Sequence, residues 1–221
     1  FMLVLVSILC AGTTMTYDLG TPIIEQNSEF SIVKLDATQT WGNPGDPELP
    51  WFGIKLLLPV GTEATEINIK RSNPITYKLG KPIQPLQRQY PLSHQILEPA
   101  TAPNPEIYNT DLAFPATIYN GLRTEFLCGH PIAFTAVSPF EYNPVQNSLV
   151  FYRSISIDVT SAGSSRALEA AQLLKRDQFI VQRLQKSVDN HQNIPLYTSQ
   201  RTVGYEYLMI IDGAKAAEYG R

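Results

Sequence analysis

Short apolar runs separated by Pro, Gly and Asn fill the chain from residue 29 to about residue 159, a pattern typical of antiparallel strands joined by turns. The clearest run is residues 149–159, in which Ile155, Ile157 and Val159 alternate with polar residues. This alternation predicts a strand with one buried face. We expect further strands at residues 30–35, 53–58, 66–70, 75–79, 117–122 and 131–137. Such a set predicts a mainly β fold, an antiparallel β-sandwich over residues 17–162.

A proline-rich segment interrupts this pattern. Residues 81–108 contain six prolines in 28 residues, a density that leaves no regular element longer than a few residues. We expect the segment to run over the surface in an extended form. A polyproline ligand for another protein is the functional alternative.

The composition changes after Thr160. Residues 163–201 begin with Gly and Ser and continue with Ala, Leu, Gln, Lys and Arg at helical spacing, which predicts a helical linker of one or two helices. Ser165 is a candidate N-cap, because its hydroxyl can accept a hydrogen bond from the first turn. Four apolar residues fall on one expected stripe: Leu173, Ile180, Leu184 and Val188.

Both ends of the chain suggest segments of a larger precursor. Residues 1–16 contain an apolar run that ends in small residues, which indicates a signal peptide without its charged start and hence a secreted or cell-surface protein. A buried N-terminal strand is the alternative. The run is too short to span a bilayer, so we expect no stable membrane anchor. Residues 202–221 contain a strand-like run, 206–211, followed by helix formers, which predicts the start of a truncated α/β domain.

Charge and motifs exclude several classes of function. The 221 residues include 17 basic and 20 acidic ones, and the net charge is −3. Because no run of Lys and Arg forms a stripe, nucleic acid is not an expected partner. The sequence has no Walker loop, dinucleotide-binding glycine motif or serine nucleophile motif, so we expect no cofactor.

Cys128 and His130 are candidates for nucleophilic chemistry. Residues two apart on a strand share a face, and a Cys beside a His can form an activated thiolate. Nothing in the neighbouring sequence would orient the histidine, so we prefer a structural cysteine at a strand entrance. His94, His130 and His191 lack the spacing of metal ligands, and we assign no metal site and no catalytic residue.

Basic residues in exposed segments are candidates for proteolytic processing, because proteases cut where a suitable side chain lies on flexible chain. Arg201 is the first candidate, since it ends an irregular stretch just before the expected strand at 206–211. The other candidates lie in the helical linker: Arg176, Lys175 and Arg166.

Three segments, in this order, resemble the propeptide of the gingipain family of secreted cysteine peptidases: 45–59 (GDPELPWFGIKLLLP), 108–115 (YNTDLAFP) and 129–159, which begins GHPIAFTAVSPFEYNP. The block Pro139 to Pro144, followed by a long strand, is the most specific part. The residues that carry the resemblance are Gly45, Pro47, Leu49, Pro50, Pro59, Tyr108, Pro115, Gly129, Pro139, Tyr142, Asn143 and Pro144. The run YEYLMIID near the C-terminus resembles the first strand of the family's caspase-like catalytic domain.

The resemblance implies a β-sandwich propeptide that assists folding, covers the active site of its peptidase until export, and is removed after basic residues. The partner is then the catalytic domain of the same precursor. The family's catalytic His and Cys follow its first strand, so residues 1–221 would contain neither, and only the full-length parent would be a cysteine endopeptidase. We further expect an exposed Lys or Arg of the propeptide to enter the specificity pocket of the peptidase.

Two alternatives remain open at this point. A secreted β-sandwich that binds carbohydrate or protein would use Trp41, Trp51 and the 11 tyrosines as stacking platforms. A structural component of a secretion or surface assembly could share the same fold without a peptidase.

Overall fold

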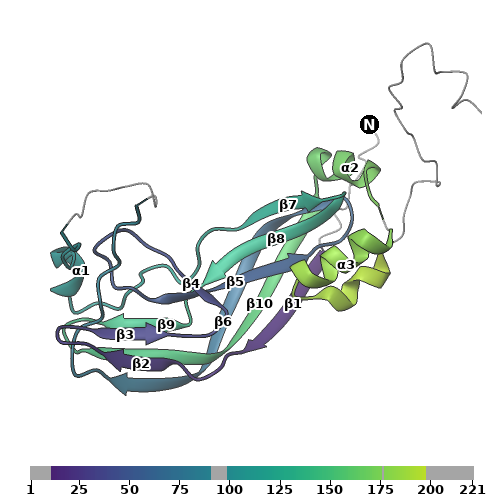
Figure 1. Ribbon diagram of the computed structural model, residues 1–221. Helices are drawn as coiled ribbons and strands as arrows, with labels where there is room; N and C mark the ends of the chain where they lie inside the picture. Colours follow the sequence, from purple (N-terminus) through teal and green to yellow (C-terminus); the bar gives the residue numbers. More distant parts are fainter. Residues whose placement is uncertain (1–10, 91–98, 176, 198–221) are drawn as a thin grey trace, which may run out of the picture.

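Two antiparallel sheets of four strands each dominate the computed structural model, which describes residues 11–90, 99–175 and 177–197 (Figure 1). The first sheet has the order β1-β10-β6, and β9 also pairs with β10; its strands are β1 (Ala11–Asp18), β10 (Ser148–Gly163), β6 (Thr62–Lys78) and β9 (Phe140–Asn143). The second sheet has the order β4-β5-β8-β7, with β4 (Thr38–Thr40), β5 (Pro50–Leu57), β8 (His130–Val137) and β7 (Arg123–Leu127). A separate pair is formed by β2 (Ile23–Gln26) and β3 (Ser31–Lys34).

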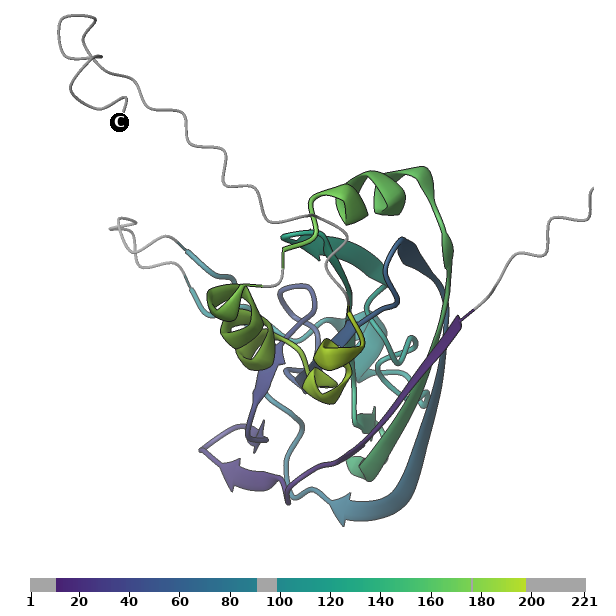
Figure 2. The ribbon, with the colours of Figure 1, turned by 90° about the vertical axis from the view of Figure 1, so that its right-hand side faces the viewer.

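The helices lie at opposite ends of the domain (Figure 1). The short helix α1 (Pro105–Tyr108) lies at one end, while α2 (Ser165–Gln172), α3 (Gln178–Ser187) and the 3₁₀ helix η1 (His191–Leu196) lie at the other. Figure 2, viewed from this second end, shows α2 and α3 in front of the strands. The chain is therefore mainly antiparallel β, as the sequence predicts.

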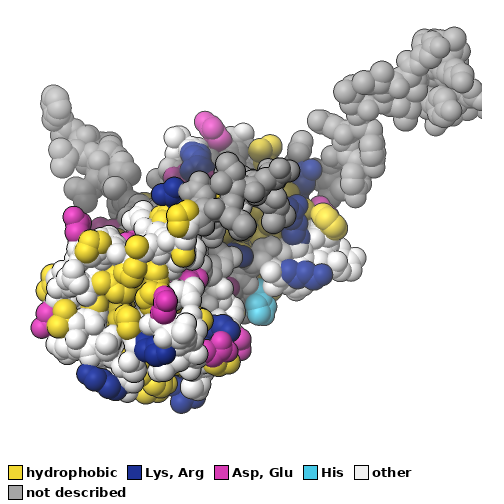
Figure 3. All heavy atoms as spheres, turned by 60° about the vertical axis from the view of Figure 1, so that its left-hand side comes forward, with side chains coloured by type: hydrophobic (Ala, Val, Ile, Leu, Met, Phe, Trp, Pro, Cys, Tyr) yellow, Lys and Arg dark blue, Asp and Glu magenta, His cyan; other side chains and the backbone are white. Residues whose placement is uncertain are grey.

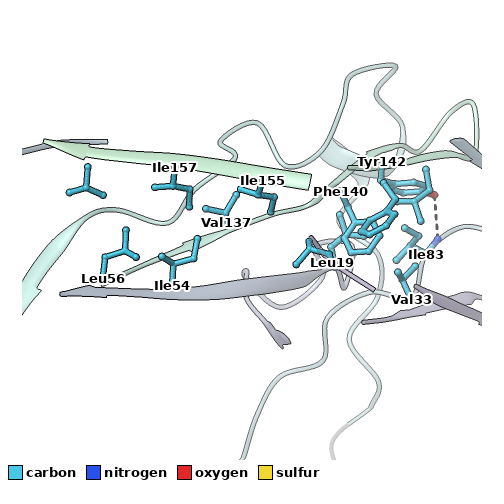
Figure 4. Close-up of a cluster of buried hydrophobic side chains, with 14 of the residues drawn as sticks. Leu19, Val33, Ile54, Leu56, Ile83, Val137, Phe140, Tyr142, Ile155 and Ile157 are labelled. Carbon is cyan, nitrogen blue, oxygen red and sulfur yellow. Dashed lines mark hydrogen bonds between the residues drawn. The ribbon is translucent and has the colours of Figure 1, made fainter. Parts of the chain in front are cut away.

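The main core lies between the two sheets. Ile54 and Leu56 of β5 point toward Ile155 and Ile157 of β10, with Val137 of β8 beside them (Figure 4). Alternate residues of a strand face opposite sides, so Leu57 points away from this core and joins a second cluster beneath α3. Because β5 contributes buried side chains on both of its faces, its sequence is a nearly continuous apolar run.

Most of the expected strands are confirmed, and two are joined. The runs predicted at 66–70 and 75–79 form the single strand β6, which continues through Pro74. Proline is tolerated because β6 lies at the edge of its sheet, where a missing N–H need not leave a neighbouring strand unpaired. Residues 81–90 and 99–108 have only a four-residue helix and isolated bridges, in agreement with the proline density.

The expected strand at 117–122 is wrong. These residues make a single bridge, Tyr119 with Val137, and the strand begins only at Arg123. Gly121, with φ at +61°, turns the chain just before β7 starts. The strands β2, β4, β7 and β9 were not predicted; each has five residues or fewer.

The structure changes both predicted boundaries of the β domain. Residues 11–16, assigned from the sequence to the end of a signal peptide, belong to β1 and pair with β10, from Ala11 opposite Ser161 to Thr16 opposite Ser156. Residues 11–18 are therefore a strand of the folded domain, whereas most of the apolar run for which a buried strand was the alternative lies outside the described residues. Residues 1–10 lie outside the described residues, and a signal peptide there stays a prediction. At the other end, β10 continues to Gly163.

The predicted helical linker is two helices that pack on the sheet. Ser164, and not Ser165, caps α2 by accepting from the Ala167 N–H. Leu173 is 62% exposed and lies off the predicted stripe, because α2 ends at Gln172 and Leu174 is buried in its place. Ile180, Leu184 and Val188 are buried as expected. These helices form part of the domain.

Candidate functional site at the helical end of the domain

Asp189 and Asn190 attach the C-terminal part of the described chain, residues 177–197, to the open edge of β5. This part is called the C-terminal segment below. The Asn190 side chain accepts from the Leu57 N–H at 2.7 Å and donates to the Leu57 carbonyl at 2.9 Å. The Asp189 N–H donates to the Lys55 carbonyl at 2.8 Å, and the Lys55 N–H donates to the Asp189 carboxylate at 2.9 Å. Because β4 pairs with β5 only at residues 50–52, these four bonds satisfy a part of the edge that β4 leaves open.

A second apolar cluster lies under this attachment, on the outer face of β5 and β8. Leu57 and Ile132, which are cross-strand partners, form its floor. The C-terminal segment supplies most of the remaining buried members, which are Ile180, Leu184, Val188, Ile194 and Tyr197. Leu174, from the connection between α2 and α3, completes the cluster. The helical end is therefore held by apolar burial and by edge hydrogen bonds together.

Tyr17 of β1 also reaches this segment. Its hydroxyl donates to the Asp189 carboxylate at 2.9 Å, and its ring packs edge-to-face on Phe52. Burial, and then the charge of Asp189 and the hydrogen bond to it, raise the pKa of Tyr17 well above its ordinary value. Asp189 thus joins β1, β5 and the C-terminal segment.

Cys128 and Gly129 form the two-residue turn of the β7–β8 hairpin. Both have positive φ, +48° and +83°, as a type I′ hairpin turn requires. The turn contacts the end of α2: a Cβ at Gly129 would lie 2.6 Å from the Leu174 backbone, and the Lys175 N–H donates to the Cys128 carbonyl. Cys128 is half-buried and packs on the second cluster.

His130 is buried at the start of β8. Its Nδ1 lies 3.2 Å from the carbonyl oxygens of Leu127 and Cys128, and its ring centre lies 5.2 Å from that of Tyr197. These contacts support a structural role for both residues, which the sequence analysis preferred only for Cys128. Among the described residues no group of three His, Cys, Asp or Glu side chains is placed to hold a metal ion. None of the helices in these residues has the length and apolar character to cross a membrane.

The processing candidates occupy different environments. Arg166 lies in the first turn of α2, with its guanidinium 3.3 Å from Glu125, 3.7 Å from Glu63 and stacked on Phe126. Lys175 is exposed in the irregular connection between α2 and α3. Arg176 and Arg201 lie outside the described residues. Of the two candidates that the structure describes, only Lys175 lies outside regular secondary structure.

A comparison with protein families identifies the domain. The family model Propeptide_C25 matches residues 23–182, which include every strand except β1, the whole of α2 and the first half of α3. The chain belongs to the Propeptide_C25 family. No curated protein matches this propeptide.

Chains of solved structures have a similar fold, and two of them are gingipain pro-domain structures. One is a complex of Porphyromonas gingivalis RgpB pro- and mature domains, with a TM-score of 0.64 and 18% identity over 82% of this chain and 93% of that chain. The other concerns zymogenic latency of gingipain K from Porphyromonas gingivalis, with a TM-score of 0.56 and 19% identity over 74% of this chain and 98% of that chain. The family match and the shared fold confirm the predicted resemblance to a gingipain propeptide.

Within this propeptide, the residues of the first family motif fix turns and strand ends. Gly45 has φ at +96° and is enclosed by backbone: it donates to the Leu86 carbonyl and accepts from the Asn104 N–H, and a Cβ would lie 3.1 Å from the Ala102 carbonyl. The other residues are also structural. Pro47 bridges to Pro85, Leu49 is buried, Pro50 begins β5, and the Pro59 carbonyl accepts from Thr62.

Tyr108 and Tyr142 tie the proline-rich segment to β9. The Tyr108 hydroxyl donates to the Ile83 carbonyl at 2.7 Å, and the Ile83 N–H donates to the Tyr142 hydroxyl at 3.3 Å (Figure 4). Tyr142 in turn donates to Asn147. Burial raises the pKa of Tyr108 above its ordinary value, with smaller effects from Tyr142 and nearby acidic groups. Pro115 follows Phe114, whose backbone exchanges hydrogen bonds with Tyr142.

The block Pro139 to Pro144 binds three strands together. The Arg71 guanidinium donates to the carbonyls of Ser138 and Phe140, pairs with Glu141, and stacks 4.3 Å from the Tyr152 ring centre. The Tyr152 hydroxyl also donates to Glu141. At the end of the block, the Asn143 side chain donates to Asp111 and accepts from the Gln146 N–H, while the Pro144 carbonyl accepts from Asn147. The motif is therefore explained by packing and hydrogen bonding.

The surface at the end of the domain away from α2 and α3 carries acidic, basic and apolar side chains (Figure 3). On the face shown in Figure 3, acidic and basic side chains are interspersed, and apolar side chains form a patch at the end away from α2 and α3. Trp41 is 57% exposed, whereas Trp51 is only 7% exposed. Of the two tryptophans proposed as stacking platforms, only Trp41 is therefore available to a ligand.

Sequence analysis did not identify Asp189 and Asn190. Two short polar residues after a helix are typical of an ordinary turn, and only the structure shows that they meet the edge of β5. The signal that could have indicated this role is the run of buried apolar positions on both sides of them.

Proposed function

We propose that this propeptide is the latency and folding module of a gingipain-like cysteine endopeptidase precursor. It binds the catalytic domain, covers the active site until export, and is removed by proteolysis. The observation that carries the proposal is the Propeptide_C25 match over 23–182 on a fold shared with gingipain pro-domains. The catalytic residues belong to the peptidase, and the propeptide acts by a preorganised surface.

The RgpB structure is a complex of pro- and mature domains, which supports an intramolecular partner for this chain as well. Export to the medium or cell surface follows from this role, and residues 1–10 are the remaining candidate for part of a signal peptide. Residues 202–221 lie outside the described residues; that they begin a caspase-like domain stays part of the proposal.

The precursor itself tests latency. A precursor that carries this propeptide should not react with an active-site-directed thiol probe, and should react once the propeptide is cleaved and separated. Equal labelling before and after cleavage would contradict a covered active site. A catalytic-cysteine variant of the precursor controls for labelling elsewhere.

Proteolytic removal is proposed at basic residues, with Arg201 as the first candidate. Arg201→Ala should slow maturation on a gel, because it removes the side chain that a protease of basic specificity recognises. The matched control is Arg166→Ala, because Arg166 lies in a helix and pairs with Glu63 and Glu125. Normal processing of Arg201→Ala would assign removal to another site.

Blocking by a basic side chain is part of the proposal. Between the two candidates that the structure describes, Lys175 supports such a role better than Arg166, because its side chain is exposed outside a helix. The binding-module alternative retains one supporting observation, the exposed side chain of Trp41. Binding of the isolated chain to a polysaccharide, with loss in Trp41→Ala, would favour that alternative.

A further inference from the structure

The structure joins the β domain and the α3–η1 segment (residues 177–197) through contacts that do not depend on the covalent connection at Lys175. We propose that the outer face of β5 and β8 is a binding site for this segment, which stays bound when the chain is cut after Lys175. A cut in this connection would then leave a two-piece propeptide. The consequence for latency rests on the proposed function; the binding itself does not.

The two sides of the connection are anchored separately. On the upstream side, the Lys175 N–H donates to the Cys128 carbonyl, and Leu174 packs against the Gly129 turn. On the downstream side, α3 has its own N-cap, because the Asp177 side chain accepts from the Ile180 N–H at 3.0 Å. A break after Lys175 therefore removes neither the end of α2 nor the start of α3.

The binding site combines an apolar floor with a polar edge. The floor is Leu57 and Ile132, on which the segment places side chains from both ends, from Ile180 in α3 to Tyr197 after η1. At the edge, Asp189 and Asn190 make four hydrogen bonds to the backbone of Lys55 and Leu57, and Tyr17 adds a fifth to Asp189. Peptides are known to bind along exposed sheet edges through backbone bonds. Here one bond is of that kind, and the side chains of Asp189 and Asn190 make the other three.

This arrangement has a consequence for the order of processing. The piece that begins after Lys175 carries α3 and η1 and remains joined to all that follows residue 197. A first cut at Lys175 would thus leave the β domain attached to the downstream chain through the β5 edge and the second cluster. Separation would require a cut beyond Tyr197, or loss of the β domain's fold.

The test uses the full chain with a specific protease sequence, flanked by Gly and Ser, inserted after Lys175. Complete cleavage is verified on a denaturing gel, and the products are passed over a sizing column under native conditions at micromolar concentration. We expect the two pieces to elute together at the position of the uncut chain. Separate elution of the pieces would overturn the proposal, whether or not the chain inhibits a peptidase.

Variants identify the surface that holds the pieces. Asn190→Ala in the cut chain should release the downstream piece about tenfold faster, because it leaves the Leu57 backbone groups unpaired. Gln192→Ala changes an exposed side chain of η1 and should release it at the unsubstituted rate. If Asn190→Ala fails to fold before cleavage, Tyr17→Phe offers a milder change that removes only the bond to Asp189 and should still hasten release. Equal release rates for all forms would contradict a role for this edge.

Discussion

The side chain of Asn190 satisfies both backbone polar groups of Leu57, donating to its carbonyl oxygen at 2.9 Å and accepting from its N–H at 2.7 Å. The two residues are 133 positions apart in the chain. This contact fixes the helical end of the propeptide on the sheet that carries its core. The segment that leads toward the proposed catalytic domain is thereby held in a defined place.

Replacing Asn190 should destabilise the whole domain. In Asn190→Ala the buried N–H and carbonyl of Leu57 lose their partners, and we expect the free energy of unfolding to fall by about 2–4 kcal/mol. Urea denaturation followed by circular dichroism measures this loss. Gln192→Ala, an exposed neighbour, should change it by less than about 0.5 kcal/mol; a similar loss in both variants would contradict the assigned bonds.

The β7–β8 turn requires glycine at position 129. An alanine there would have φ near +83° and a Cβ 2.6 Å from the Leu174 backbone, so both the turn and the end of α2 must shift. We expect Gly129→Ala to lower the free energy of unfolding by about 2 kcal/mol or more. Gly20→Ala, with no atom within 4 Å of the added Cβ, is the matched control and should be near neutral. A tolerated Gly129→Ala would show that α2 is not packed as described.

The Arg71–Glu141 pair should matter more than an exposed pair of the same kind. The Arg71 side chain is 9% exposed and serves two carbonyls and a ring as well as Glu141. We expect Arg71→Met to cost about 3 kcal/mol, since it removes the counter-ion of a partly buried carboxylate and the donor to two carbonyls. Lys34→Met breaks the exposed pair with Glu25 and should cost less than about 1 kcal/mol. Thermal or urea unfolding of both variants measures the two losses. Equal losses in the free energy of unfolding would contradict a larger role for the Arg71–Glu141 pair.

Buried tyrosines should make the domain sensitive to alkali. Burial raises the pKa values of Tyr17, Tyr108 and Tyr197 above their ordinary value of 10.0. In the unfolded chain these groups ionise from about pH 10, while the folded chain keeps them neutral, so their contribution is present below pH 10 and is lost as the pH rises further. We expect the part of the phenolate absorbance that comes from these buried tyrosines to appear only as circular dichroism is lost above pH 10. Gradual ionisation of all tyrosines in a folded chain would contradict this burial.

The sequence predicts the parts of the fold that depend on local pattern. Alternation in 149–159 and the apolar run in 53–58 identified β10 and β5, because these strands bury one or both faces. The run at 117–122 was wrongly assigned to a strand. It pairs with β8 through one isolated bridge, Tyr119 with Val137, and does not form a continuous ladder. Leu173 was misplaced because the helix is interrupted between α2 and α3. Residues on the two sides of this break no longer fall on one helical stripe.

The helical end could not be derived in the same way. Its attachment joins Lys55 and Leu57 to Asp189 and Asn190, and neither short polar residue has a local pattern that indicates a distant strand edge. The assignment of residues 11–16 to a signal peptide failed for a related reason, since pairing with β10 is a long-range property. The family motif predicted the fold better than local patterns did. Its turn residues and the buried Tyr142 are linked through hydrogen bonds in the structure, so they occur together in the sequence.

Inhibition in trans tests the central claim most directly. The full chain, folded separately, is added in increasing amounts to the mature gingipain-like peptidase of the same precursor, and the initial rate of peptide hydrolysis is measured. We predict a dose-dependent and complete loss of activity at micromolar chain, and none with chain unfolded beforehand. Unchanged hydrolysis at saturating folded chain, with no complex on a sizing column, would contradict a latency role.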